Sequence, residues 1–297
     1  MAVTAEESGS AATALQGHII RTPMLAAPML SRQFGCDLFV KLECQQYTSS
    51  FKARGAYIAM QSLNAAQRKA GVIAMSAGNH AQAVAYHAER MGIPAVIVMP
   101  AQTPFAKVAR TRAYGAEVVL EGRNLNECEG TVNTLIDERG LTLIHPYDNA
   151  LVMTGQGTVG LEMLEDEPDL DMLVVPIGGG GLIGGIATIA REMRPNIKII
   201  GVQTEAYPTM QLAIAGKEIE CGGETLAEGI AVKKPGSVTR PVVDQHVDNI
   251  ILVSERQLEW AVGALVEQQR VVAEGAGAAG IAAIYGNPAL FAGKKVG

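Results

Sequence analysis

The sequence predicts an α/β protein of two domains, each an open, twisted and mainly parallel sheet flanked by helices. Two observations indicate this fold class. Hydrophobic residues make up 48% of the 297-residue chain but aromatic residues only 4%, so aliphatic side chains must build the core, which suits buried parallel strands. From about Gly71 onward, short runs rich in Val and Ile alternate with longer Ala-rich amphipathic stretches, which is the alternation of strands and crossover helices.

The first series of this alternation covers about residues 71–145. Strands are expected at 71–76, 94–100, 116–121 and 141–146, and helices at 79–92 and 103–115, both of which end at a glycine. In a second series, strands are expected at 171–177 and 196–203, with a helix between them that starts near Leu182; the segments 249–254, 257–269 and 275–286 follow. We therefore expect a small domain, 71–145, inserted into a large domain formed by 1–64 and 150–297.

Charge and composition exclude several classes of function. The formal net charge of −6 and the lack of a basic run argue against a nucleic-acid surface, because neutralising phosphates requires clustered Lys and Arg. The N-terminus is acidic and does not read as a secretory signal, and no stretch reaches transmembrane length. The cysteines lack zinc-site spacing, which predicts reduced thiols in a cytoplasmic protein that acts on a small molecule; they are Cys36, Cys44, Cys128 and Cys221.

The strongest local signal is a run of four glycines between an apolar strand and a helix. Gly178, Gly179, Gly180 and Gly181 leave their backbone N–H groups unobstructed, and the helix that opens at Leu182 adds partial positive charge. A tight strand-to-helix turn is the alternative, but such a turn needs only one or two glycines. The run therefore predicts a phosphate-binding turn.

The same glycines also fit a dinucleotide-binding fingerprint. Gly179, Gly181 and Gly184 match G-x-G-x-x-G, and Glu205 follows the next strand about where a ribose ligand belongs. A nicotinamide-dependent oxidoreductase is therefore an alternative function. It leaves the segments around Lys52 and Ser76 without a purpose.

Lys52 begins a helical stretch directly after Phe51 and three hydroxyl residues, 48–50. The helix dipole disfavours a lysine in the first turn and lowers the pKa of its amine toward the neutral, nucleophilic form. The alternative is an ordinary solvated lysine behind a serine cap. Phe51 either belongs to the core or covers one face of a flat cofactor ring.

The loop from Ser76 to His80 follows a strand and precedes a helix. Open α/β sheets bind ligands at the carboxyl ends of their strands. Here the hydroxyl of Ser76, the amide of Asn79 and the N–H groups of the helix start can hold a carboxylate or a ring oxygen. The alternative is a helix capped by Asn79, with His80 incidentally in its first turn.

Taken together, several motifs occur in an order that resembles one family: SSFKARGA, SAGNHAQAVA, GTVGLE, PIGGGGLIGG, GVQTE and AEGAGAAG. The chain resembles the fold-type II pyridoxal-phosphate enzymes, specifically the threonine dehydratase and serine racemase group, from about Arg21 to the last residues. The resemblance implies a fold like that of the tryptophan synthase β chain, with pyridoxal 5'-phosphate bound to the large domain, and a homodimer or homotetramer.

The resemblance also implies a role for each residue singled out above. Lys52 would be the catalytic Schiff-base lysine and would remove the substrate's Cα proton. Phe51 would lie against the pyridine ring, and Asn79 would hydrogen-bond the 3-oxygen of that ring. The phosphate would be bound by Gly178, Gly179, Gly180, Gly181 and Leu182. The substrate carboxylate would sit in the loop formed by Ser76, Ala77, Gly78, Asn79 and His80.

The implied reaction is dehydration and deamination of a small β-hydroxy amino acid such as L-threonine or L-serine, which yields a 2-oxo acid and ammonia. Alternatives are a 3-hydroxyaspartate dehydratase or a serine or aspartate racemase of the same fold, or an inert ligand-sensing relative. Racemases of this group have a second serine where this chain has Ala77, which carries no titratable hydrogen. We therefore expect elimination with little racemisation.

Three positions depart from the family pattern. Glu205 matches one ligand of a divalent-cation site in relatives, but Gln211 stands where serine racemase has an acidic ligand, so no metal is predicted. The Ala-Asp-Gly segment of relatives is Ala-Glu-Gly around Glu228. Relatives continue past Gly297 into a strand and a Ser-Gly-Gly-Asn turn whose serine binds the pyridine nitrogen, so we expect this chain to be part of a longer protein.

Overall fold

The structure is a computed structural model that describes residues 4–297, and its strands form two sheets. The six-stranded sheet has the order β1 (Met24–Ala26), β2 (Asp37–Lys41), β10 (Lys295–Val296), β7 (Met172–Pro176), β8 (Lys198–Thr204) and β9 (Asn249–Val253). The four-stranded sheet has the order β5 (Glu117–Leu120), β4 (Ala95–Met99), β3 (Val72–Met75) and β6 (Thr142–Leu143). All pairs are parallel except β1 with β2, which confirms the predicted α/β class with mainly parallel sheets.

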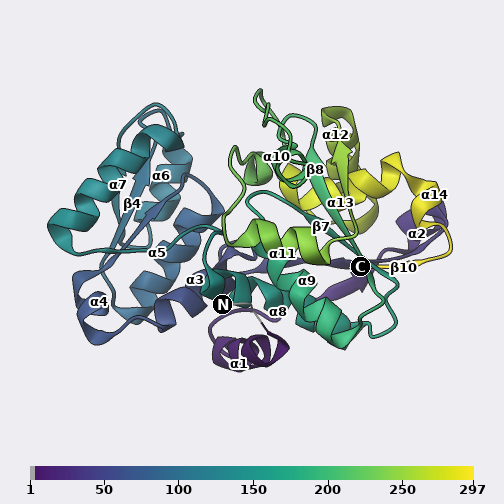
Figure 1. Cartoon of the computed structure of the whole chain (residues 1–297), viewed down its shortest axis with the longest axis horizontal. Coiled ribbons are helices and arrows are strands. Elements are labelled where there is room, and N and C mark those ends of the chain that lie inside the picture. The colour runs from purple at the N-terminus through teal and green to yellow at the C-terminus, as the bar shows by residue number, and fades with distance from the viewer. Residues whose placement is uncertain (1–3) are drawn as a thin grey trace.

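Helices cover both sheets, which occupy opposite halves of the molecule (Figure 1). Around the four-stranded sheet lie α4 (Ala65–Ala70), α5 (Asn79–Met91), α6 (Phe105–Arg112) and α7 (Leu125–Arg139). The other half contains α2 (Pro28–Phe34), α8 (Ala150–Asp166), α9 (Gly181–Met193), α10 (Thr209–Ile214), α11 (Thr239–His246), α12 (Glu255–Ala264), α13 (Gly275–Gly286) and α14 (Pro288–Phe291). Helix α1 (Ala5–Leu15) packs on α8 and on α3 (Lys52–Gln61). Within the described chain, 4–297, no helix combines the length and the apolarity needed to cross a membrane.

The predicted strands and helices of the first series lie where the alternation places them, with one shorter than expected. The run 141–146 forms a strand only at Thr142–Leu143. This strand is at the edge of the four-stranded sheet and pairs with β3 alone. Pro146 has no backbone N–H to donate, so the ladder cannot extend to it. The residues that follow the strand, 145–148, instead lie in the candidate active site.

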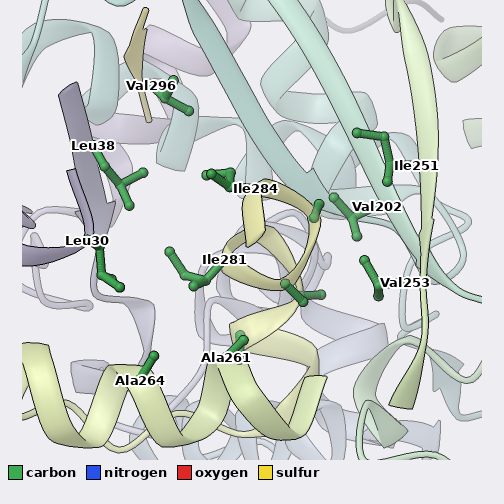
Figure 2. Packing of buried hydrophobic residues seen from close by; sticks show 14 of the residues in the cluster. Leu30, Leu38, Val202, Ile251, Val253, Ala261, Ala264, Ile281, Ile284 and Val296 are labelled. Carbon is green, nitrogen blue, oxygen red and sulfur yellow. The ribbon is translucent and has the colours of Figure 1, made fainter. Parts of the chain in front are cut away.

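Helix α13 forms the centre of the core on one face of the six-stranded sheet (Figure 2). Its sequence, GAGAAGIAAIYG, is apolar nearly all round, as expected for a helix that is buried over most of its surface. Figure 2 shows Ile281 and Ile284 of α13 with Leu30 and Leu38 on one side and Val202 of β8 on the other, all in one buried cluster. The start of α13 is thereby held at the end of the sheet. Residues on the opposite face of the same strands pack against α9.

Glycines bring three helices close together and so position their first residues. A Cβ added at Gly155 of α8 would lie 2.7 Å from Gly55 Cα of α3. A Cβ added at Gly157 would lie 2.9 Å from the carbonyl oxygen of Gly185 in α9. Any larger side chain at these contacts would push the helices apart. Helix α8 is therefore a fixed spacer between α3, which begins at Lys52, and α9, which begins at the glycine turn.

A cluster of buried charges locks α3 further. The guanidinium of Arg54, which is 0% exposed, donates to Glu162 Oε1 of α8 at 2.6 Å. It also donates to Glu43 Oε1 of the 3₁₀ helix η1 (Glu43–Gln45) at 2.7 Å. Lys41 of β2 binds the second oxygen of Glu162 at 2.7 Å. The two cations and two carboxylates thus form one connected cluster: Lys41, Glu43, Arg54 and Glu162.

Candidate active site

The amine of Lys52 is desolvated and has no acidic partner. As the first residue of α3, Lys52 donates its backbone N–H to Ser50 Oγ, and its Nζ donates to the carbonyl oxygen of Pro146 at 2.6 Å. Among residues 4–297 no carboxylate forms an ion pair with it. Burial lowers the pKa of Lys52 to about 8, although the charge of Glu274 acts in the opposite direction. An appreciable share of the amine is therefore neutral near neutral pH, as nucleophilic attack requires.

Phe51 lies beside the same amine. Lys52 Nζ is 5.3 Å from the centre of the Phe51 ring, and the ring is only partly buried, packed at the edge of the core beside α9. Part of the Phe51 side chain thus stays accessible near the amine. This placement agrees with both interpretations of Phe51, the core residue and the cover for a flat ring.

The segment from His145 to Asp148 joins the amine to the glycine turn. Pro146 accepts the hydrogen bond from Lys52, and the ring of the next residue, Tyr147, packs directly on Gly179. A Cβ added at Gly181 would lie 3.1 Å from Tyr147 Cα. The backbone thus approaches the glycine turn as closely as side-chain-free residues allow. Sequence reasoning missed this segment, because the run 141–146 was interpreted as a strand only.

The glycine turn has the conformation that its residues predict. Gly180 is the N-cap of α9 and has φ +96°, a left-handed conformation that side chains disfavour. A Cβ on Gly180 would also lie 2.7 Å from Met210 Cε. The first intrahelical bond runs from the Gly184 N–H to the Gly180 carbonyl oxygen, so the N–H groups of Gly181 and Leu182 have no helical partner. Such N–H groups at a helix start form an anion-binding site.

The loop before α11 holds the turn from its other side. The hydroxyl of Thr239 donates to the carbonyl oxygen of Gly179 at 2.5 Å. Asp148 accepts from the backbone N–H groups of Ser237 at 2.8 Å and Val238 at 2.7 Å. Desolvation would raise the pKa of Asp148, but the hydrogen bonds from Val238 and Ser237 hold it below its ordinary value. Asp148 therefore stays ionised and anchors the loop against the turn.

The loop from Ser76 to His80 leads into α5, and this helix is not capped by Asn79, as the alternative interpretation of the loop had it. Gly78, not Asn79, is the N-cap of α5. Ser76 Oγ accepts from the Gly78 N–H at 3.2 Å, and the methyl group of Ala77 packs against the core of the four-stranded sheet. The side chain of Asn79 is thus not used as a cap, and its Nδ2 donates to Glu274 Oε1 at 2.8 Å.

His80 is buried and neutral. Its Nε2 lies 2.7 Å from the carbonyl oxygen of Ile144, which can only accept, so Nε2 carries the hydrogen. Burial and the charge of Lys52 lower the pKa of His80 to about 3. The remaining ring nitrogen, Nδ1, is an acceptor and has no hydrogen-bond partner among the described side chains. A carboxylate in this loop would therefore be bound by the backbone N–H of His80 and not by its ring.

Glu274 belongs to the site and was not singled out from the sequence. It is the N-cap residue of α13, and its side chain is accessible to solvent. Desolvation nevertheless raises the pKa of Glu274, against the effects of Asn79, Lys107 and Lys52. Glu274 is therefore a partly desolvated carboxylate at the start of α13. The signal was present in the motif AEGAGAAG, but the side chain's partner is 195 residues away.

The structure brings no metal ligands together at Glu205. Glu205 is exposed, and its backbone N–H donates to the carbonyl oxygen of Val253. Gln211 Nε2 donates to the carbonyl oxygen of Ile250 at 2.9 Å. Over residues 4–297 there is no group of three His, Cys, Asp or Glu side chains that could hold a metal ion. Nothing in the described part of the chain therefore supports a cation site at Glu205.

The match to a known family decides the class of the protein. The model of the family "Pyridoxal-phosphate dependent enzyme" matches residues 15–297. The chain belongs to this family. An L-threonine ammonia-lyase of Thermotoga maritima is 44% identical over 296 residues, which are 99% of this chain and 74% of that protein. A catabolic L-threonine dehydratase of Staphylococcus aureus is 44% identical over 277 residues, 92% of this chain and 80% of that protein.

Solved structures of pyridoxal-phosphate enzymes have the same fold. Serine racemase from Dictyostelium discoideum superposes with a TM-score of 0.93 at 32% identity, over 99% of this chain and 96% of that chain. The processed form of threonine deaminase isoform 2 from Solanum lycopersicum gives a TM-score of 0.92 at 33% identity, over 98% of this chain and 82% of that chain. The predicted resemblance to the threonine dehydratase and serine racemase group is thus confirmed, and the dinucleotide-dependent alternative is set aside.

The residues at the candidate site fit the cofactor of this family. A free, partly deprotonated amine is what an aldehyde requires, and Lys52 provides it. A phosphate requires unobstructed N–H groups, and the left-handed turn at Gly180 together with the start of α9 provides these. Asn79 retains a second amide hydrogen for an oxygen acceptor. These groups meet around the segment from His145 to Asp148 and at Glu274.

Proposed function

We propose that this pyridoxal-phosphate enzyme dehydrates and deaminates a small β-hydroxy amino acid, L-threonine or L-serine, to a 2-oxo acid and ammonia. The observation that carries the proposal is the desolvated Lys52 amine, which donates to the carbonyl of Pro146 and forms no ion pair with a carboxylate of residues 4–297. The names of the relatives that are 44% identical, L-threonine ammonia-lyase and L-threonine dehydratase, support the reaction class and the substrate.

In this proposal, each predicted residue holds one part of the cofactor or the substrate. When bound, the cofactor draws electrons from the substrate Cα and so makes its hydrogen acidic. Lys52 would hold the aldehyde carbon of the cofactor, and its free amine would remove the Cα proton as a general base. Phe51 would cover one face of the ring, and Asn79 would donate to the ring oxygen. The phosphate would be bound by the N–H groups of Gly178, Gly179, Gly180, Gly181 and Leu182.

The substrate carboxylate is assigned to the loop of Ser76, Ala77, Gly78 and His80. The start of α5 presents backbone N–H groups without helical partners there, and these stabilise a negative charge. Ser76 Oγ already accepts from Gly78, which leaves its hydroxyl hydrogen free to donate. The neutral ring of His80, bonded to Ile144, fixes the loop against β6.

Racemisation is the second candidate function, because serine racemase has the same fold at a TM-score of 0.93. A racemase must return a proton to the opposite face of Cα. The methyl group of Ala77 has no exchangeable hydrogen, and it packs against the core of the four-stranded sheet. Elimination is therefore favoured over racemisation.

Product assays on the purified protein with pyridoxal phosphate test the proposal. We expect 2-oxobutyrate from L-threonine and pyruvate from L-serine, whereas oxaloacetate formed faster from 3-hydroxyaspartate would favour that alternative dehydratase. Formation of D-serine from L-serine faster than pyruvate would favour the racemase. An Ala77→Ser variant is the matched comparison, and we expect its ratio of racemisation to elimination to exceed that of the wild type. A protein that forms neither 2-oxobutyrate from L-threonine nor pyruvate from L-serine would refute the proposal.

We further infer a small domain at 71–145, inserted into a cofactor-binding domain formed by 1–64 and 150–297, and a homodimer or homotetramer in the cytoplasm. The strand pairing supports the domain division, because the strands at 72–143 pair only with one another. Exposed Met29 of α2 and Leu290 of α14, two helices in contact, support an interface between subunits. The free state of all four cysteines supports a reducing compartment.

A further inference from the structure

Glu274 lies where the two halves of the molecule meet at the candidate active site. The backbone beside it packs closely on the segment that begins at Leu226, because a Cβ added at the next residue, Gly275, would overlap the backbone of Leu226. On its other side, a Cβ added at Gly229 would lie 3.0 Å from Glu274 Oε1. The carboxylate is therefore held between α13 and the chain segment 226–229. From this fixed place it reaches Asn79 at the start of α5.

The charged neighbours of Glu274 are otherwise occupied. Lys107 of α6 pairs with Glu228 at 2.6 Å, and Lys52 Nζ donates to Pro146. Within the described chain, the hydrogen bond from Asn79 Nδ2 is the one direct polar contact of the Glu274 side chain. Lys107, Glu228 and Lys52 act on Glu274 only through their electrostatic fields.

We propose that Glu274 is a positioning residue that turns the amide of Asn79 toward the cofactor. A carboxylate oxygen accepts hydrogen bonds, so Glu274 selects the amide nitrogen of Asn79 and excludes the flipped orientation that would present its oxygen. The nitrogen has two hydrogens. Glu274 accepts one, and the second points to an oxygen acceptor. This inference rests on the proposed function, because the ring oxygen of the cofactor is that acceptor.

The orientation matters because a flipped amide would place two acceptor oxygens against each other. Asn79 Oδ1 would then face the carboxylate of Glu274, and neither oxygen has a hydrogen to donate to the other. An acceptor without a donor partner costs the desolvation of that group. Glu274 thus defines the chemistry that Asn79 offers to the ring without touching the ring. It also ties α5 of one half of the molecule to α13 of the other.

Two substitutions separate this role from a role in charge or proton transfer. Glu274→Gln keeps an acceptor oxygen, whereas Glu274→Ala removes it. We expect Glu274→Ala to weaken the binding of pyridoxal phosphate about tenfold, the loss of one hydrogen bond to a charged group. It should also shift the visible absorption band of the bound cofactor. Glu274→Gln should restore the band and bind within about threefold of the wild type.

Glu228→Gln is the matched control, since Glu228 is an exposed carboxylate of the same region that does not contact Asn79. It should bind the cofactor like the wild type and leave the absorption band unchanged. If Glu274→Gln is as impaired as Glu274→Ala, the charge and not the orientation matters, which contradicts the proposal. Unchanged binding and absorption in Glu274→Ala would contradict it as well.

A double-substitution cycle tests whether Glu274 acts through Asn79. With Asn79 replaced by alanine, we expect the further change Glu274→Ala to alter cofactor affinity less than about twofold, because coupled residues are not additive. Multiplicative losses would contradict the inference. Thermal unfolding of the cofactor-free variants checks their folding. A wild type that does not bind the cofactor refutes the proposed function and this inference together, whereas a normal Glu274→Ala variant refutes only the latter.

Discussion

Lys52 and Arg54 lie two residues apart on α3, yet their surroundings are opposite. Arg54 is fully buried, and burial alone would lower its pKa, but Glu43 and Glu162 hold it above the ordinary value. Lys52 has no such partner, and burial lowers its pKa to about 8. The paired cation of Arg54 fixes the start of α3, and the amine of Lys52 is left without an ion pair among the described residues. Arg54 thus stabilises the position of α3, whereas the nearby Lys52 supplies the reactive amine.

The largest expected effect is on turnover. Lys52→Ala should lower the rate of 2-oxo acid formation by roughly 10²–10⁴-fold or more, because it removes both the amine that holds the cofactor and the general base. Lys217→Ala, at an exposed lysine, is the control and should keep the wild-type rate. Steady-state assays with L-threonine and L-serine measure both variants. A Lys52→Ala enzyme with near-normal turnover would contradict the assigned role.

Stability should separate the two residues in the opposite direction. Arg54→Met should lower the free energy of unfolding by about 3–5 kcal/mol, because it removes the cation that Glu43 and Glu162 share and leaves Glu162 with Lys41 alone. Lys52→Met, two residues earlier on the same helix, should not lower the free energy of unfolding. This substitution removes a desolvated charge that forms no ion pair among the described residues. Urea unfolding of the cofactor-free proteins gives both values. Equal losses would remove the contrast between the two residues.

The dependence of stability on pH sharpens the same contrast. The pKa of Lys52 is about 8 in the folded protein and about 10.4 in an unfolded chain. Between these values the unfolded state binds more protons at Lys52, so the contribution of Lys52 to stability should rise with pH across this window and be lowest below it, and it is measured as the difference between the wild type and Lys52→Met. Lys52→Met should lack this rise. The rate of cofactor binding should also increase as the pH rises toward 8. More of the Lys52 amine is then neutral, and only a neutral amine attacks the aldehyde of the cofactor.

An exposed ion pair should contribute least. Lys107 and Glu228 are 2.6 Å apart, but their side chains are 37% and 74% exposed, so solvent screens their attraction. Glu228→Gln should change the free energy of unfolding by less than about 1 kcal/mol, and the change should shrink in high salt. A loss comparable with that of Arg54→Met would show that the pair fastens the two halves of the molecule together.

Features encoded within one segment could be predicted from the sequence. The alternation of Val-rich and Ala-rich runs placed β3, β4, β7 and β8, and the four glycines placed the start of α9. The helix start at Lys52 followed from the preceding hydroxyl residues. These elements depend on local periodicity and on the backbone freedom of glycine. The structure contains them with boundaries shifted by only a few residues.

Features that depend on distant contacts could not be predicted in the same way. The carbonyl of Pro146 is 94 residues from Lys52, and Glu274 is 195 residues from Asn79. The helix dipole was expected to lower the pKa of Lys52, but burial by remote segments is its largest cause. The short strands β1, β2 and β10 complete the six-stranded sheet by long-range pairing. No local pattern specifies these partners.

Reduction with borohydride in the presence of pyridoxal phosphate, followed by mass spectrometry of the digested protein, tests the central claim most directly. The account predicts that the reduced cofactor is covalently attached to the peptide that contains Lys52, and that Lys52→Met abolishes this label. Attachment to another lysine, or an unlabelled protein, would contradict it.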